Sequence, residues 1–473
     1  MKKTILSLLV TVLLAACALA LTSCSAHVHT VSEPVKENEV EPTCLKNGSY
    51  EEVIYCLECK MELSRRSIPV ERTEHKYDGN ECVWCGFVNT ESTEGLAFVL
   101  NAAKDGYFLQ SIGSCKEAEE LYIGSYNGLP VVKISYGALE GCKNLKRVTI
   151  SDTVVEIEPY AFRDCTNLES INIPKDIELI PYECFKGCSS LPSIEIPDTV
   201  DEIAGGAFKS CTALSNVTLP SALVTLGSEA FMYCTSFTEV TVPSKTITIG
   251  NYAFSGCTGI STLNISEGVA VIGTQSFFGC TKLESLSLPY SVNSIGVASF
   301  GSCTALKTVT MDDNITIIGS DAFSGCFSLE SVTLSKSLQQ IQTAAFLGCA
   351  ALKSIDIPAS TTSIGNNVFS GCTSLTEVTF PNSMALIGDS TFLGCTALSK
   401  VTFGTGLISL GIDTFSGCNL LNEVVFSNPE GWKWFENLSS TRGTPIPVET
   451  LNDPEIAALY MMGTYKSYYL KKF

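Results

Sequence analysis

The chain has 473 residues, more than a single compact core usually contains, and 45% of them are hydrophobic while only 17% are charged. This composition argues against long disordered stretches, which are poor in apolar residues. With 49 acidic and 30 basic residues the formal net charge is −19, so the chain repels phosphates, which argues against binding to nucleic acid or to a bare anionic membrane.

The first 23 residues have the pattern of an export signal. Two lysines precede an apolar stretch, Thr4–Leu21, whose length is near the lower limit for a membrane span, so a plain membrane anchor is one interpretation. The stretch ends in small residues and a cysteine, which favours processing instead. The run Leu-Thr-Ser-Cys24 resembles a bacterial lipobox, in which the cysteine is acylated and becomes the first residue, and Cys17 is the alternative acceptor. We therefore predict a lipoprotein signal over residues 1–23 and an exported chain that is lipid-anchored to the cell envelope and exposed at the surface.

Residues 24–43 are polar and acidic and are predicted to form a tether, and residues 44–90 a small Cys/His-rich module. The module contains two C-x-x-C pairs, and each such turn points two thiolates at one place, so the two together complete the tetrahedron of a zinc-ribbon-like site. The predicted ligands of one structural zinc are Cys56, Cys59, Cys82 and Cys85, with Cys44, His27, His29 and His75 as second candidates. Two disulfides are the alternative in an exported chain, and a redox role is a third interpretation. The module also resembles the short His/Cys modules of bacterial surface proteins, which supports a metal.

From Cys142 to Cys418 a cysteine stands at every twenty-third position, thirteen in all. Phe precedes nearly every cysteine by three residues, and Leu, Ile or Phe follows three later. Ile or Leu comes fifteen residues after the cysteine and is mostly followed by Gly. A repeat of this length with an L-x-x-V-x-I run predicts a solenoid. In each turn we expect a short parallel strand with alternate residues inward, a proline ending it, and a turn at the Ile-Gly pair. The Phe-x-x-Cys segment is expected to form one helical or 3₁₀ turn.

Stacked turns place equivalent residues above one another, roughly 4.8 Å apart. The cysteines are therefore expected to form an internal column of free thiols beside a column of phenylalanines, with Cys184 as a variant in the same interior. Disulfides along the column are disfavoured because parallel Cβ vectors keep neighbours too far apart and because thirteen is an odd number.

The motif I-G-x-x-A-F-x-G-C-x-x-L-x-x-V-x-I-P closely resembles the BspA-like class of leucine-rich repeats, over about residues 92–473. The resemblance implies an α/β leucine-rich-repeat solenoid over residues 142–427, an N-terminal cap over 91–141 and a C-terminal cap over 428–473, with Trp432 and Trp434 covering the last turn. It also implies a protein at the bacterial cell surface that binds other proteins.

The solenoid contains no histidine and no phosphate or calcium loop motif, so we expect no enzyme. The residues that point outward from the strands form a wide, neutral, hydroxyl-rich row that holds no aromatic cluster. We predict it to be the binding surface, with Thr218, Thr241, Asn264, Ser287, Thr310, Thr333, Asp356 and Thr379 as its central members. Two functions stay open: an adhesin that contacts host or neighbouring-cell proteins, and a non-catalytic envelope scaffold without an external ligand.

Overall fold

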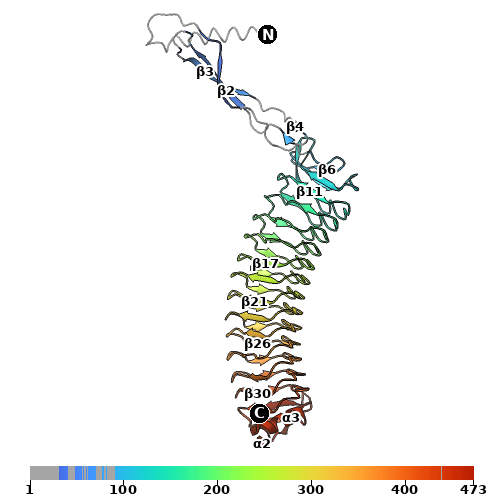
Figure 1. Cartoon of the computed structure of the whole chain (residues 1–473), viewed down its shortest axis with the longest axis vertical. Helices are drawn as coiled ribbons and strands as arrows, with labels where there is room; N and C mark the ends of the chain where they lie inside the picture. Colours follow the sequence, from blue (N-terminus) through green and yellow to red (C-terminus); the bar gives the residue numbers. More distant parts are fainter. Residues whose placement is uncertain are drawn as a thin grey trace. The chain divides into compact units, whose positions relative to one another are not determined.

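The computed structural model describes residues 31–40, 48–55, 57, 60, 62–70, 77–78, 81–82, 91–437, 439–440 and 442–472. The chain divides into two compact units, residues 1–90 and residues 91–473. The first unit contains small antiparallel sheets, and the second is a stack of short turns that form a solenoid (Figure 1).

In the first unit, three strands form an antiparallel meander: β1 (Val35–Val40), β2 (Gly48–Tyr55) and β3 (Glu62–Val70). A second pair, β4 (Tyr77–Asp78) and β5 (Glu81–Cys82), is also antiparallel. Residues 35–40 were expected to belong to the polar tether, yet they form the edge strand β1. Glu37 of this strand pairs with Arg65 on β3, which lies outside residues 24–43.

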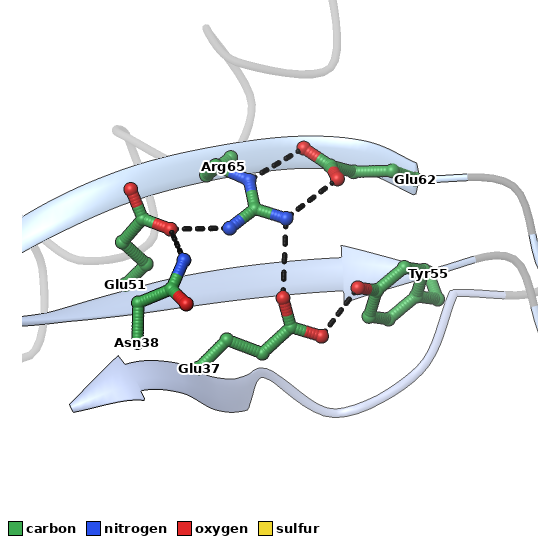
Figure 2. Close-up of polar contacts among 6 residues, drawn as sticks. All are labelled: Glu37, Asn38, Glu51, Tyr55, Glu62 and Arg65. Carbon is green, nitrogen blue, oxygen red and sulfur yellow. Dashed lines mark hydrogen bonds and ion pairs between the residues drawn. The ribbon is translucent and has the colours of Figure 1, made fainter.

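Arg65 on β3 connects all three strands of the meander (Figure 2). Its guanidinium lies 3.1 Å from Glu37 on β1 and 2.8 Å from Glu62, and it also pairs with Glu51 on β2. Tyr55 donates its hydroxyl hydrogen to Glu37 at 2.5 Å. A charged cluster therefore joins the three strands in addition to their backbone pairing.

The second unit begins with strands that close the first end of the solenoid. β6 (Ala97–Leu100) pairs antiparallel with β7 (Tyr107–Ser111), while β8 (Glu120–Ile123) and β10 (Leu129–Ile134) run parallel to the first two repeat strands, β11 (Arg147–Ile150) and β12 (Glu156–Ile157). The short β9 (Ser125–Tyr126) pairs antiparallel with β10. The cap thus passes into the repeats without a break in strand pairing.

Most turns of the solenoid have a first strand that follows the cysteine, as expected, but the turns after Cys188, Cys211 and Cys349 lack one. These strands form short parallel sheets rather than one long sheet. Beyond β11 they are β13 (Ser170–Ile171), β17 (Glu239–Val242), β19 (Thr262–Ile265), β21 (Ser285–Leu288), β23 (Thr308–Met311), β25 (Ser331–Thr333), β28 (Glu377–Thr379), β30 (Lys400–Phe403) and β32 (Glu423–Phe426).

A second strand of two residues stands where only a turn at the Ile-Gly pair was expected. These strands form the longest sheet of the described chain, parallel from β14 to β31, which we call the second sheet. Its strands in spatial order are β14 (Leu179–Ile180), β15 (Glu202–Ile203), β16 (Thr225–Leu226), β18 (Thr248–Ile249), β20 (Val271–Ile272), β22 (Ser294–Ile295), β24 (Ile317–Ile318), β26 (Gln340–Ile341), β27 (Ser363–Ile364), β29 (Leu386–Ile387) and β31 (Ser409–Leu410), followed by three strands of the C-terminal cap.

The Phe-x-x-Cys segment closes each turn, and the helical or 3₁₀ turn expected there is absent from the described repeats. In the turn of Phe254, alternate N–H groups donate in two directions. Those of Tyr252 and Phe254 donate to the following turn at 2.8 and 2.7 Å, whereas those of Ser255 and Cys257 donate to the residue three positions earlier. In a helix, successive N–H groups donate to carbonyls of the same segment, and here every second one donates to the next turn instead. The left-handed φ of 59° at Tyr252 is also incompatible with a right-handed helix.

Columns of identical side chains fill the interior. The phenylalanines stack from Phe162 to Phe415 with ring centroids 5.1 to 5.8 Å apart and planes within 15° of one another. The cysteines from Cys165 to Cys418 are buried and free, and Cys184 is buried too, so the predicted core columns are confirmed. The strand pairing also gives Cys115 the place in the cap that Cys142 has in the first repeat. The column therefore begins one cysteine earlier. Its number of cysteines is then even, so an odd number no longer argues against disulfides along it.

The C-terminal cap covers the last turn with strands and two short helices. β35 (Tyr469–Lys472) runs antiparallel to β31, and β33 (Trp432–Phe435) and β34 (Thr444–Pro445) extend the same sheet. The helices are α2 (Val448–Asn452) and α3 (Pro454–Met462). Trp432 is buried against Phe426, and Trp434 contacts Tyr468, as the expected cover of the last turn requires. Within the part of the chain that the structure describes, no helix is long and apolar enough to cross a membrane.

Candidate binding faces of the solenoid

The predicted binding residues all lie exposed on the first-strand side of the solenoid. We call this set, Thr218, Thr241, Asn264, Ser287, Thr310, Thr333, Asp356 and Thr379, the threonine face. Six of its members lie within strands, whereas Thr218 and Asp356 belong to turns whose first segment is too irregular to count as a strand. In the strand register, Thr241 is beside Asn264 and Thr310 lies between Ser287 and Thr333. The structure therefore brings the predicted residues together into one row.

Ion pairs between successive turns border the threonine face. Lys307 lies 2.9 Å from Glu284, and Lys353 lies 2.8 Å from Glu330, each pair joining residues 23 positions apart. The hydrogen bond from Lys353 lowers the pKa of Glu330. Exposed pairs of this kind contribute little to stability, but they neutralise the charges beside the row. Apart from the Asp356 carboxylate, the face consequently presents hydroxyl and amide groups.

A cluster of tyrosines lies on a different side of the turns, near the N-terminal end of the solenoid. Tyr136, Tyr160 and Tyr182 come from successive turns, with ring centroids 4.9 and 5.5 Å apart. The exposed fraction is 63% for Tyr136 and 46% for Tyr182, and the Arg163 guanidinium lies 4.3 Å from the centre of the Tyr160 ring. Tyr and Arg are the residues most enriched at the energetic centres of protein interfaces.

Sequence reasoning missed this cluster because its members do not share one repeat position. Tyr160 follows Tyr136 by 24 residues and Tyr182 follows Tyr160 by 22, so a search at a strict period of 23 does not align them. Partial burial raises the pKa of Tyr160, and the neighbouring Glu183 carboxylate raises that of Tyr182. The two phenols therefore stay neutral at physiological pH.

An acidic hollow of about 560 Å³ lies at the C-terminal cap, lined by Glu423, Glu449, Asn452, Asp453, Pro454 and Glu455. Asp453 has a structural role there, since its side chain accepts hydrogen bonds from the N–H groups of Glu455 and Ile456 and so caps α3. Glu423 pairs with Lys400 at 2.6 Å. The local fold therefore accounts for these two carboxylates without a bound cation.

The predicted zinc ligands and lipid site fall largely beyond the residues that the structure describes. Cys24, Cys56, Cys59 and Cys85 are outside them, and Cys82 is placed only through the backbone of β5. Within the described ranges, no three His, Cys, Asp or Glu side chains gather closely enough to hold a metal ion. The buried thiols of the column stay protonated, because burial raises the pKa of Cys257, for example, to about 12.

The comparisons with known proteins find relatives of the solenoid. The family model for the BspA type leucine rich repeat region matches residues 128–236, 224–353 and 340–439, with six copies. A leucine-rich repeat protein from Bacteroides ovatus is 28% identical with a TM-score of 0.59, and the match covers 70% of this chain and 93% of that one. A leucine rich cell surface protein from Faecalibacterium prausnitzii is 25% identical with a TM-score of 0.43, covering 71% and 94%.

The pneumococcal vaccine antigen PcpA is 17% identical with a TM-score of 0.37, covering 71% of this chain and 87% of that one. A comparison with curated proteins gave no match. The family model spans well over half of the residues, and its repeat is the one that the Phe and Cys columns display. The chain therefore belongs to the BspA-type leucine-rich repeat family.

Proposed function

We propose that the protein is a surface-exposed, lipid-anchored module that binds extracellular proteins of a host or a neighbouring cell through the threonine face. The observation that carries the proposal is a row of eight exposed residues, one from each of successive turns, on a solenoid whose interior is a single packed core. A rigid row of hydroxyl and amide groups offers hydrogen bonds over a long contact without an entropy cost for ordering the backbone. The tyrosine cluster supplies a second contact of the composition typical of interface centres.

The binding proposal is tested by capture of partners from host-cell surface and matrix extracts on immobilised protein beginning at Ser25. We expect Ser287→Arg with Thr310→Arg to abolish capture, because two bulky charges then stand in the middle of the row. Tyr290→Arg with Phe327→Arg adds the same two charges at exposed positions outside both the threonine face and the second sheet, and serves as the matched control. Capture that survives the first pair and is lost with the second would move the binding site away from the threonine face.

The alternative of an envelope scaffold is distinguished on intact cells. A surface-exposed solenoid is accessible to added protease, whereas a scaffold beneath an outer layer is protected. Full protection of the chain on intact cells, with cleavage after lysis, would contradict surface exposure. The non-catalytic character of the proposal agrees with the reported relatives, which are leucine-rich repeat proteins.

For the N-terminal region we propose lipidation of Cys24 and one structural zinc held by Cys56, Cys59, Cys82 and Cys85. Cys24→Ser should then leave an unacylated precursor that is poorly retained, while Cys17→Ser should have little effect. A purified chain beginning at Ser25 should contain about one zinc per chain, which a chelator removes. Mass spectrometry that finds two disulfides and no metal there would refute the zinc site.

A further inference from the structure

The second sheet carries one outward row whose charge changes along its length. The strand pairings place these residues side by side, each in contact with the next: Glu202, Thr225, Thr248, Val271, Ser294, Ile317, Gln340, Ser363, Leu386, Ser409, Lys471 and Lys433. Leu179 on β14 precedes Glu202 in the same register, and Pro445 on β34 follows Lys433. Between these two residues the row starts with a carboxylate, continues through nine uncharged residues from β16 to β31, and finishes with two lysines of the cap.

The residues immediately before the strands also change from acidic to uncharged along the sheet. At the acidic end, Glu178 and Asp201 are exposed immediately before β14 and β15. The residues immediately before the nine neutral strands are again uncharged: Val224, Ile247, Ala270, Asn293, Thr316, Gln339, Thr362, Ala385 and Ile408. A chain with a net charge of −19 thus holds a sheet face with an acidic end, a neutral middle and a basic end.

Large aliphatic side chains in the neutral zone are distributed evenly about its middle strand. Val224 and Ile247, at the first two strands, are 43% and 57% exposed, and Ile408 and Leu386, at the last two, are 53% and 50% exposed. Ile317 on β24, the fifth of the nine strands, is 38% exposed. Reversal of the direction of the sheet therefore exchanges the two aliphatic strands at one end of the zone for the two at the other end, and the acidic end for the basic end, while Val271 on β20 changes places with Ser363 on β27.

We propose that two copies of this chain associate face to face through the second sheet, with their solenoids antiparallel and a twofold axis passing at β24. A twofold interface is self-complementary, and the distribution of charge and aliphatic residues about β24 meets this requirement. In this arrangement β16 faces β31 and β18 faces β29, so Val224 meets the strand of Ile408. Glu202 then faces Lys471 of the second copy, and Glu178 faces the strand of Lys433.

The charge distribution favours a second copy of this chain as the partner, and it favours the antiparallel orientation of the two solenoids. Copies of an acidic chain repel each other, and the neutral zone is a region where they approach without facing carboxylates. A parallel pair would place Glu178, Asp201 and Glu202 against themselves, whereas the antiparallel pair places them against lysines. The dimer does not involve the threonine face. A result that refutes the dimer therefore leaves the proposed function untouched, and the reverse also holds.

The size of the face predicts a weak, reversible dimer. Nine strands at a spacing of about 4.8 Å and about four residues across at about 3.3 Å each give roughly 550 Å² per copy. The pair therefore buries about 1,100 Å², near the lower limit for a specific interface. We expect dissociation in the micromolar range, with the charged ends setting the direction more than the affinity.

Sedimentation velocity on the chain beginning at Ser25 tests the proposal through a charge exchange. We expect Glu202→Lys and Lys471→Glu each to raise the dimer dissociation constant about tenfold, and the double variant to restore it, because the two new charges again face each other across the twofold axis. Ile317→Glu should leave only monomer, since two carboxylates then meet at the axis. Glu239→Lys makes the same charge change at the start of β17 and should leave the dimer unchanged.

Lys471 also contacts the Phe435 ring, at 5.3 Å, so its replacement could loosen the cap. Thermal melting checks each variant, and the exchange of Glu178→Lys with Lys433→Glu provides a second, independent rescue. A chain that stays monomeric up to high micromolar concentration overturns the proposal. So does a dimer that is insensitive to Ile317→Glu, or single variants that weaken it with no rescue in either double variant.

Discussion

From Cys165 to Cys418, each cysteine of the column does more than fill space, because its thiol donates a hydrogen bond to a carbonyl of an earlier turn. The carbonyl of Phe231 accepts the N–H of Cys234 at 3.1 Å and the S–H of Cys257 at 3.0 Å. The same arrangement recurs along the column, for instance between Cys349 and the carbonyl of Phe323 at 3.3 Å. A small side chain that is both apolar and a weak donor suits this buried position.

The phenylalanine and cysteine columns differ in what their loss costs. Phe254→Ala should lower the free energy of unfolding by about 3–5 kcal/mol, because the ring is fully buried between those of Phe231 and Phe277. Cys257→Ala should cost about 1–2 kcal/mol, since it removes one sulfur and one weak hydrogen bond. Urea denaturation measures both, with Thr241→Ala on the threonine face as a control that stays within about 0.5 kcal/mol.

A thiol count on unfolded, unreduced protein checks the same interpretation. The described cysteines are free, so the repeat region should yield nearly all of its thiols. A count near zero there, together with a large loss of stability in Cys257→Ala, would mean that the column is bridged.

At the scale of elements, glycines in the repeat stand at two positions for two different reasons. Gly388 follows β29, and a Cβ there would lie 2.5 Å from the backbone carbon of Gly365 in the preceding turn. Gly394 has space around it but a φ of +73°, which side chains rarely adopt. The first position needs close approach of two backbones, and the second needs left-handed geometry.

Substitution of each glycine by alanine and by asparagine distinguishes close backbone approach from left-handed geometry. At Gly394, alanine should cost about 1–2 kcal/mol and asparagine less, because asparagine tolerates the left-handed region. At Gly388 the order should reverse, since the larger side chain pushes harder on the preceding turn, at a cost of about 1–3 kcal/mol or more. Thermal melting of the four variants gives the order, and the same order at both positions would refute the distinction.

The meander of the first unit should respond to acid through Arg65. Hydrogen bonds from Asn38 and Arg65 lower the pKa of Glu51, and the bond from Arg65 lowers that of Glu62. Carboxylates with a lowered folded-state pKa stabilise the fold above their ordinary pKa of about 4.3 and lose this contribution as the pH falls through the folded value. Protection of the β2 amides against hydrogen exchange should therefore fall below about pH 4.

Arg65→Gln should lower that protection at neutral pH and flatten its dependence on pH. Arg66→Gln is the matched control, because among the described residues Arg66 forms its ion pair with Glu52. Equal pH dependence in the native chain and in Arg65→Gln would show that other groups govern the acid response.

Across the whole molecule, the sequence predicted the elements whose signal repeats and missed those whose signal is short or shifted. The period of 23, the inward Phe and Cys columns and the outward threonine face all follow from residues that recur at fixed positions. The second sheet was missed because a two-residue strand has no alternation to recognise, as in Leu386–Ile387. The helical turn was wrongly expected because spacing does not reveal whether an N–H donates within its turn or to the next one.

The hydrogen bonds between successive turns also determine how the solenoid responds to tension along its axis. Tension along the stack pulls on the bonds between turns, for example from Phe254 to Ser276, while those inside a turn are spared. A turn that peels from one end releases 23 residues, which extend to about 80 Å at roughly 3.3–3.6 Å per residue. A protein held at a cell surface would thus lengthen in steps under shear while the remaining turns keep their shape. Single-molecule stretching should show a staircase of evenly sized extensions, and one cooperative rupture of the whole stack would contradict it.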